Sequence, residues 1–157
     1  MALNQWSIPS NSGRYHVQFE VTHCDETGDF EYAVELCGMY VDPDRSLASS
    51  TGAAKIFQIR LYSVPICRLA SEELLDRLQQ WLDKYDPFVV ALATGPTHKM
   101  ELEVAPRDDL LTSTDKPALT ILHNAAYCRF EVYFVVDPTC ILQAAEQLQQ
   151  VLANHPS

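Results

Sequence analysis

The stretch YHVQFEVTHCDETGDFEYAVELCGMYV (residues 15–41) decides the fold class, because apolar and polar residues alternate on both sides of a short turn-rich segment. Val17 and Phe19 fall on one face of an extended chain, and the polar residues between them fall on the other. The same period of two continues over residues 30–36. This alternation predicts two strands with one buried and one solvent-facing side, and DETG (25–28) between them predicts the turn of a β-hairpin.

Similar patterns predict five more strands. FVVALA (88–93) is an unbroken apolar run, which is typical of a central strand or of a strand covered on both faces. The segments ALTILHN and CRFEVYFVV are expected to form a second hairpin, joined through NAA. The five expected strands cover residues 55–63, 88–93, 99–104, 118–124 and 128–136.

Two segments change to the helical period. In LASEELLDRLQQWLDKY (69–85), Leu78 and Trp81 belong to one apolar stripe, which predicts an amphipathic helix with Ser71 as its N-cap. A second stripe predicts a helix over residues 138–153. The expected order of elements is therefore β-β-β-α-β-β-β-β-α.

This order predicts an α+β fold, a mostly antiparallel curved sheet of about six to seven strands with two amphipathic helices packed on one face. A chain of 157 residues suits a single domain, residues 1–157, and we find no internal repeat. No apolar run approaches the roughly 18 residues that span a bilayer, and the start lacks a signal-peptide pattern. Five cysteines without a CxxC pair indicate reduced thiols, so we expect a cytoplasmic protein.

The net charge of −10 is distributed unevenly. Residues 1–44 contain eight carboxylates and a single basic residue, Arg14, so this segment carries −7 of the total. Such a field repels nucleic acid and anionic membranes and favours a basic protein as partner. The alternative is that the acidity only keeps the protein soluble.

The acidic hairpin is the candidate partner-binding site. Once DETG closes it, Gln18 faces Glu35 and Thr22 faces Glu31 across the two strands. Like charges held close together destabilise a sheet, so an acidic face without lysines indicates a basic partner that fills it. The structural alternative is that Arg60 on the next strand neutralises this face. The six predicted partner-binding residues are His16, Gln18, Glu20, Asp29, Glu31 and Glu35.

Motifs for chemistry are weak elsewhere. In VVDPTC (135–140), Asp137 is a good N-cap, which places Cys140 in the first turn of a helix, where the pKa of a thiol can fall. No histidine is marked as its base. The pairs in HC (23–24) and HNAAYC (123–128) offer too few ligands for a zinc site, and phosphate-binding glycine motifs are absent. We therefore expect no catalytic residue, metal or cofactor.

Two helix-containing segments carry a family resemblance. LYSVPICRLASEELLDRLQQWLDKY (61–85) combines a strand, a short helix start and an L-x-x-L-x-x-WL helix, and FEVYFVVDPTCILQAAEQLQQVL (130–152) combines a hairpin strand with a C-terminal helix. Both segments resemble the small bacterial immunity proteins of WapI-type polymorphic toxin systems. The resemblance implies binding and inhibition of a cognate toxin, with no catalytic residues. Its positions are Leu69, Glu73, Leu74, Leu75, Leu78, Trp81 and Leu82.

We therefore expect a non-catalytic, immunity-type inhibitor that binds and neutralises a basic partner protein, a bacterial toxin effector. Two alternatives stay open. An acidic secretion chaperone or adaptor would also hold a partner without chemistry, and it would form a dimer. A small cysteine-dependent enzyme would require a thiol with a lowered pKa.

Overall fold

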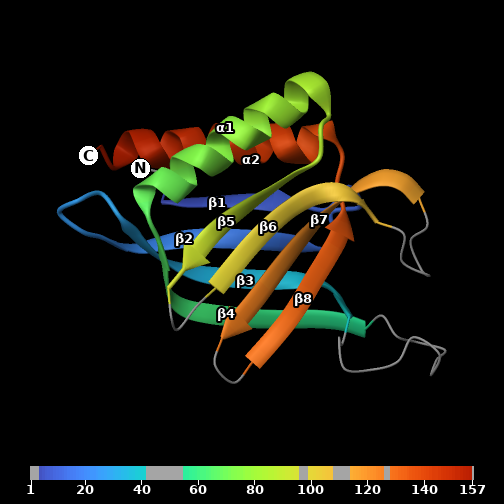
Figure 1. The fold of residues 1–157 in the computed structure, drawn as a ribbon, viewed down its shortest axis with the longest axis horizontal. Coiled ribbons are helices and arrows are strands. Elements are labelled where there is room, and N and C mark those ends of the chain that lie inside the picture. The colour runs from blue at the N-terminus through green and yellow to red at the C-terminus, as the bar shows by residue number, and fades with distance from the viewer. Residues whose placement is uncertain (1–3, 42–54, 96–98, 108–113, 126–127, 157) are drawn as a thin grey trace.

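The computed structural model describes residues 4–41, 55–95, 99–107, 114–125 and 128–156. Along them, a run of four strands and a helix occurs twice (Figure 1). The first run is β1 (Gln5–Pro9), β2 (His16–Cys24), β3 (Phe30–Val41), β4 (Lys55–Ile66) and α1 (Arg68–Lys84). The second run is β5 (Phe88–Thr94), β6 (Lys99–Arg107), β7 (Thr114–Ala125), β8 (Cys128–Val135) and α2 (Pro138–Asn154).

The broad α+β class is confirmed, but the expected single sheet of six to seven strands is wrong. Eight strands form two four-stranded antiparallel meanders, β1-β2-β3-β4 and β5-β6-β7-β8. The meanders join only where residues 39–41 of β3 pair with residues 131–133 of β8. Because β4 occupies one edge of β3, β2 and β8 follow each other along the opposite edge. The two meanders therefore diverge from this short β3–β8 pairing, which we call the fork.

Gly38 lies at the fork, between the part of β3 that pairs with β2 and the part that pairs with β8. A Cβ atom at this position would lie 2.5 Å from Val132 Cγ1 and 3.1 Å from the carbonyl oxygen of Tyr133. Real Cβ atoms essentially never approach another heavy atom as closely as 2.5 Å. The missing side chain of glycine thus lets the second meander approach the first.

Two strand predictions from the sequence need correction. The strand β1 was not predicted, because its five residues contain only two buried apolar side chains, Trp6 and Ile8, and end on Pro9. FVVALA was expected to be a central strand, but β5 ends the strand order of its meander and Val89 is 49 % exposed. The expected β7–β8 hairpin is confirmed by the pairing of Ala125 with Cys128, and its NAA turn falls partly outside the described residues.

Both helices lie side by side on one face of the strands (Figure 1). Each packs against the first strand of the other run: α2 contacts β1, and α1 contacts β5. The backbone N–H of Ser7 in β1 also donates to Gln147 Oε1 of α2, at 2.8 Å. The core between helices and strands includes Phe19, Val34, Leu36, Leu78, Trp81, Leu102, Ile121, Val132, Ile141 and Leu148.

Each helix begins after an N-cap residue whose side chain accepts a hydrogen bond from a backbone N–H of the first turn. Asp137 caps α2 as expected, and its Oδ1 accepts from the N–H groups of Thr139 and Cys140 at 2.9 and 3.1 Å. The expected N-cap of α1 is wrong. Cys67 takes that position, while Ser71 is buried inside the helix. No helix of the described residues has the length and apolar character needed to cross a membrane.

Candidate partner-binding site

The β2–β3 hairpin follows the predicted register only over its first part. Gln18 faces Glu35 as expected. Beyond Val21, one extra residue in β2 shifts the register, so that His23 rather than Thr22 faces Glu31. The six predicted residues consequently divide into an outer-face group near the middle of the strands and a group at the hairpin end.

Arg60 of β4 lies among the carboxylates of the outer-face group. Its guanidinium nitrogens lie 3.6 Å from Glu20 Oε2 and 3.6 Å from Glu35 Oε2. His16 Nε2 lies 3.0 Å from the other oxygen of Glu35. We call His16, Glu20, Glu35 and Arg60 the Arg60 network. Its side chains are 28–45 % exposed, so each pair contributes at most about 1 kcal/mol. The network supports the structural interpretation of these two acidic residues, namely that they are already compensated.

Asp25 and Asp29 at the hairpin end are held in place by the fold. Asp29 Oδ1 accepts a hydrogen bond of 2.8 Å from the backbone N–H of Arg68, and thus caps the first turn of α1 from a distant hairpin. Asp25 Oδ1 accepts from Thr27 N, Thr27 Oγ1 and Asp29 N at 2.9, 2.5 and 3.0 Å. The Thr27 hydroxyl in particular, together with these backbone groups, holds the pKa of Asp25 below its usual value.

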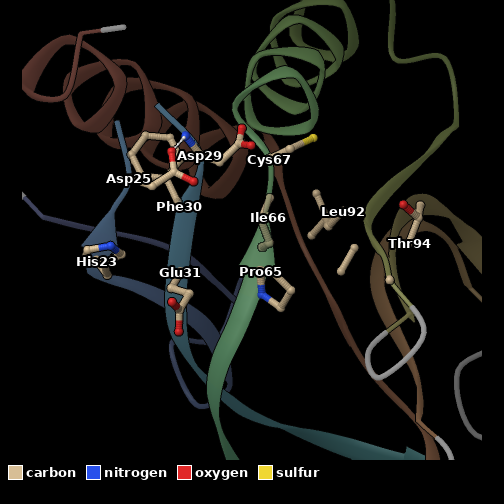
Figure 2. Close-up of a pocket in the computed structure, with 12 residues that line it drawn as sticks. His23, Asp25, Asp29, Phe30, Glu31, Pro65, Ile66, Cys67, Leu92 and Thr94 are labelled. Carbon is tan, nitrogen blue, oxygen red and sulfur yellow. Dashed lines mark hydrogen bonds between the residues drawn. The ribbon is translucent and has the colours of Figure 1, made fainter. Parts of the chain in front are cut away.

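These two aspartates and Glu31 line a pocket of about 350 Å³, the hairpin-end pocket. In Figure 2 the hairpin residues lie on one side of the end of β4, and Leu92 and Thr94 of β5 lie on the other. The pocket therefore lies between the two meanders, at the end opposite to their fork. Its lining is His23, Asp25, Asp29, Phe30, Glu31, Pro65, Ile66, Cys67, Leu92, Ala93, Thr94 and Gly95.

Each of three strands beside the pocket contains one extra residue relative to its partner. The irregularities lie between Val21 and His23 in β2, opposite Tyr32–Val34 in β4, and between Ala91 and Ala93 in β5. In β4 the bulge includes Ser63, whose φ of 56° lies in the left-handed region. Bulges of this kind bend strands and occur frequently beside functional sites. Here the bulge in β5 buries two consecutive residues, so that both Leu92 and Ala93 reach the pocket.

The described residues that line the pocket include no lysine or arginine, and the basic side chain among them is His23, which faces Glu31. Arg68 is the nearest candidate in sequence, but its guanidinium is engaged elsewhere. Nε donates to Glu72 Oε1 at 2.9 Å, and the terminal nitrogens donate to the carbonyl oxygens of Leu152 and His155 at the end of α2. Arg68 therefore ties α1 to α2, and these described contacts direct its guanidinium to Glu72 and α2 rather than to the carboxylates of the pocket.

The two residues considered for chemistry, Cys140 and His123, are buried. Cys140 is only 5 % exposed, and burial, followed by the Asp137 carboxylate, raises the pKa of its thiol. His123 is a core residue that stacks on Phe130 with a ring distance of 4.9 Å. In the part of the chain that the structure describes, no three His, Cys, Asp or Glu side chains are grouped to hold a metal ion.

Sequence reasoning included Asp29 and Glu31 but missed the rest of the pocket. Asp25 was assigned only to the turn, and Ile66 and Leu92 follow the hairpin by dozens of residues. No sequence signal connects these segments, because the pocket arises from strand bulges and from the placement of β5 beside β4. No protein-family model matches the chain, and no curated protein or solved structure matches it either.

Proposed function

We propose that this protein is a non-catalytic inhibitor of the immunity type, which acts in the cytoplasm and binds a basic partner protein, a bacterial toxin effector. The observation that supports this function is the contrast between two acidic groups on one hairpin. Glu20 and Glu35 share Arg60, whereas no ion pair among the described residues involves Asp25, Glu26 or Glu31. A fold that neutralises one acidic group and leaves the adjacent one open favours binding of a cation from outside.

Inhibition would follow from occlusion. A protein that covers the basic active-site surface of an effector prevents substrate access without performing chemistry. Complementary charge would raise the association rate constant above the roughly 10⁵–10⁶ M⁻¹s⁻¹ of neutral protein pairs. An interface of standard size would bury about 1,600 Å² in total. The hairpin end would supply the acidic centre of this interface.

The test uses the protein encoded next to this chain as the candidate effector, with growth on co-expression and association kinetics as readouts. Charge reversal at the hairpin end, Glu26→Lys with Glu31→Lys, should slow association and flatten its dependence on salt. The matched control is Glu101→Lys with Glu146→Lys, which changes net charge equally at exposed positions of β6 and α2. Equal rates and equal salt dependence for both variants would show that the hairpin end is only solvated surface.

The two alternatives predict different measurements. A secretion chaperone should be a dimer, so light scattering that gives the mass of one 17.7 kDa chain would count against it. A cysteine-dependent enzyme needs a reactive thiol, and the raised pKa of Cys140 favours the opposite. Growth rescue by a Cys140→Ala variant would separate inhibition by binding from any function of this thiol.

A further inference from the structure

We propose that the hairpin-end pocket binds one cationic side chain of the partner, lysine or arginine, as the anchor of the interface. This inference rests on the proposed function and adds the chemistry of its central contact. It moves the binding centre away from Glu20 and Glu35, which pair with Arg60, and toward Asp25, Asp29 and Glu31, of which Asp29 and Glu31 belong to the six residues predicted from the sequence.

The two kinds of lining match the two parts of such a side chain. Pro65 is exposed at the end of β4, and the buried Ile66 and Leu92 form the apolar floor of the pocket beside it, so the aliphatic stem would lie mainly against Pro65. The carboxylates lie on the hairpin side of β4, where the charged head would arrive (Figure 2). Lysine and arginine bury their stems along apolar surface while the head stays at a polar rim. An anionic or purely apolar group would meet only half of this lining favourably.

Two of the pocket carboxylates are already held in place before a cation binds. Asp25 and Asp29 each accept fold-stabilising hydrogen bonds through Oδ1, and neither makes a bond through Oδ2 among the described contacts. Their positions are thus fixed by the turn and by the start of α1. A site that is already ordered loses little conformational entropy on binding, which favours affinity. Because the pKa of Asp25 is lowered, this group stays ionised at neutral pH.

The size of the pocket fits one side chain better than a larger ligand. A volume of about 350 Å³ is at the lower end of the roughly 300–1,000 Å³ typical of ligand pockets. Interface anchors are commonly single long or aromatic side chains, arginine among the most frequent, that fill a pocket near the centre of the contact. The pocket therefore fits a projecting basic residue on a partner surface.

The direct test is an NMR titration of the ¹⁵N-labelled protein with capped amino acids. The cationic probes are N-acetyl-arginine amide and N-acetyl-lysine amide, and N-acetyl-citrulline amide and N-acetyl-norleucine amide are neutral probes with similar stems. We expect both cationic probes to shift the amide signals of the pocket, such as those of Glu31, Thr94 and Gly95, and the neutral probes to leave them in place. Equal shifts with neutral and cationic probes, or shifts spread evenly over all acidic residues, would overturn the proposal.

A pair of conservative variants sharpens the test. Glu31→Gln removes the pocket carboxylate for which the described residues provide no hydrogen bond, and it should weaken binding of the arginine probe about three- to fivefold. Glu101→Gln, an exposed position on β6, is the matched control and should leave affinity unchanged. Asp29 is avoided because its loss would also uncap α1. Identical affinities of the two variants would contradict a role for the pocket.

Probe binding and effector binding, measured on the same variants, distinguish failure of the cation site from failure of the inhibitor function. If the cationic probes bind the pocket but the neighbouring effector is not bound, the inhibitor function fails while the cation site stands. If the effector is bound equally well by the wild type and by Glu31→Gln, the anchor fails while the inhibitor function stands. Parallel losses of probe binding and effector binding in Glu31→Gln are the result expected here.

Discussion

Asp29 connects the fold and the candidate site at the scale of a single residue. Its carboxylate caps α1 through the Arg68 N–H and also lines the hairpin-end pocket. Sequence reasoning chose Asp29 for its charge alone, and its capping contact could not be predicted, because the two residues are 39 positions apart. One side chain thus carries both a structural and a proposed binding role.

Substitutions of Asp29 should separate the two roles. Asp29→Asn keeps an oxygen that can accept from Arg68 N–H, so unfolding free energy should change little, while the arginine probe binds more weakly. Asp29→Ala should lose about 1 kcal/mol in urea unfolding in addition to probe binding. Equal stability of the two variants would contradict the capping role.

Trp81 provides a test of the core. Its side chain is 3 % exposed and packs edge-on against Tyr85, with a centroid distance of 5.2 Å. Trp81→Ala should lower the unfolding free energy by about 3–5 kcal/mol, because it removes a large buried side chain and leaves a cavity. Leu69→Ala on the same helix is the control, since Leu69 is 76 % exposed, and its effect should stay within about 0.5 kcal/mol.

Cys140 should react slowly in the native protein. Because the pKa of its thiol is raised, the thiolate fraction at pH 8 is smaller than in free cysteine, and the onset of reactivity moves to higher pH. Iodoacetamide labelling followed by mass spectrometry should show slower modification of Cys140 than of the exposed Cys67. Labelling of Cys140 at the rate of free cysteine would revive the enzyme alternative.

At the scale of elements, seven of the eight described strands were predictable, whereas strand register was predictable only up to the bulges. Alternation predicted β2 and β3 and the pairing of Gln18 with Glu35. One extra residue after Val21 then changed which side chain faces Glu31. A bulge adds one residue to one strand and leaves the local apolar pattern nearly unchanged. The position of a bulge is therefore set by how the neighbouring strands twist, which the pattern does not report. The pocket, which three bulges border, was hidden for the same reason.

The fork between the meanders is tested by Gly38→Ala. The added Cβ would collide with Val132 Cγ1 at the junction of β3 and β8, so the unfolding free energy should fall by about 1–3 kcal/mol. In the double variant with Val132→Ala, the collision partner is gone, and the loss should be smaller than the sum of the two single losses. Strict additivity would show that the close approach does not matter.

At the scale of the whole molecule, the two runs of four strands are linked by their helices, because each helix packs on a strand of the other run. Because α1 packs on β5 and α2 packs on β1, each helix covers a strand of the opposite run. Arg68 strengthens the link through its hydrogen bonds to the end of α2. We therefore expect residues 1–157 to unfold as one unit.

Fragments test this single-domain prediction. Residues 1–86 and 87–157, expressed separately, should each lack a dispersed NMR spectrum, because each exposes the strand that the missing helix covers. Mixing the fragments should restore the native spectrum. A cooperative unfolding transition in either fragment alone would indicate two domains instead of one.

The sequence by itself determined the α+β class, both helices, seven of the eight described strands and the acidic character of the hairpin. These features depend on local periodicity and composition, which a chain carries wherever it folds. Only the tertiary structure decided the division into two meanders, the compensation of Glu20 and Glu35 by Arg60, and the pocket at the hairpin end. Each of these brings together segments far apart in the chain, and their meeting depends on bulges and packing that periodicity does not encode.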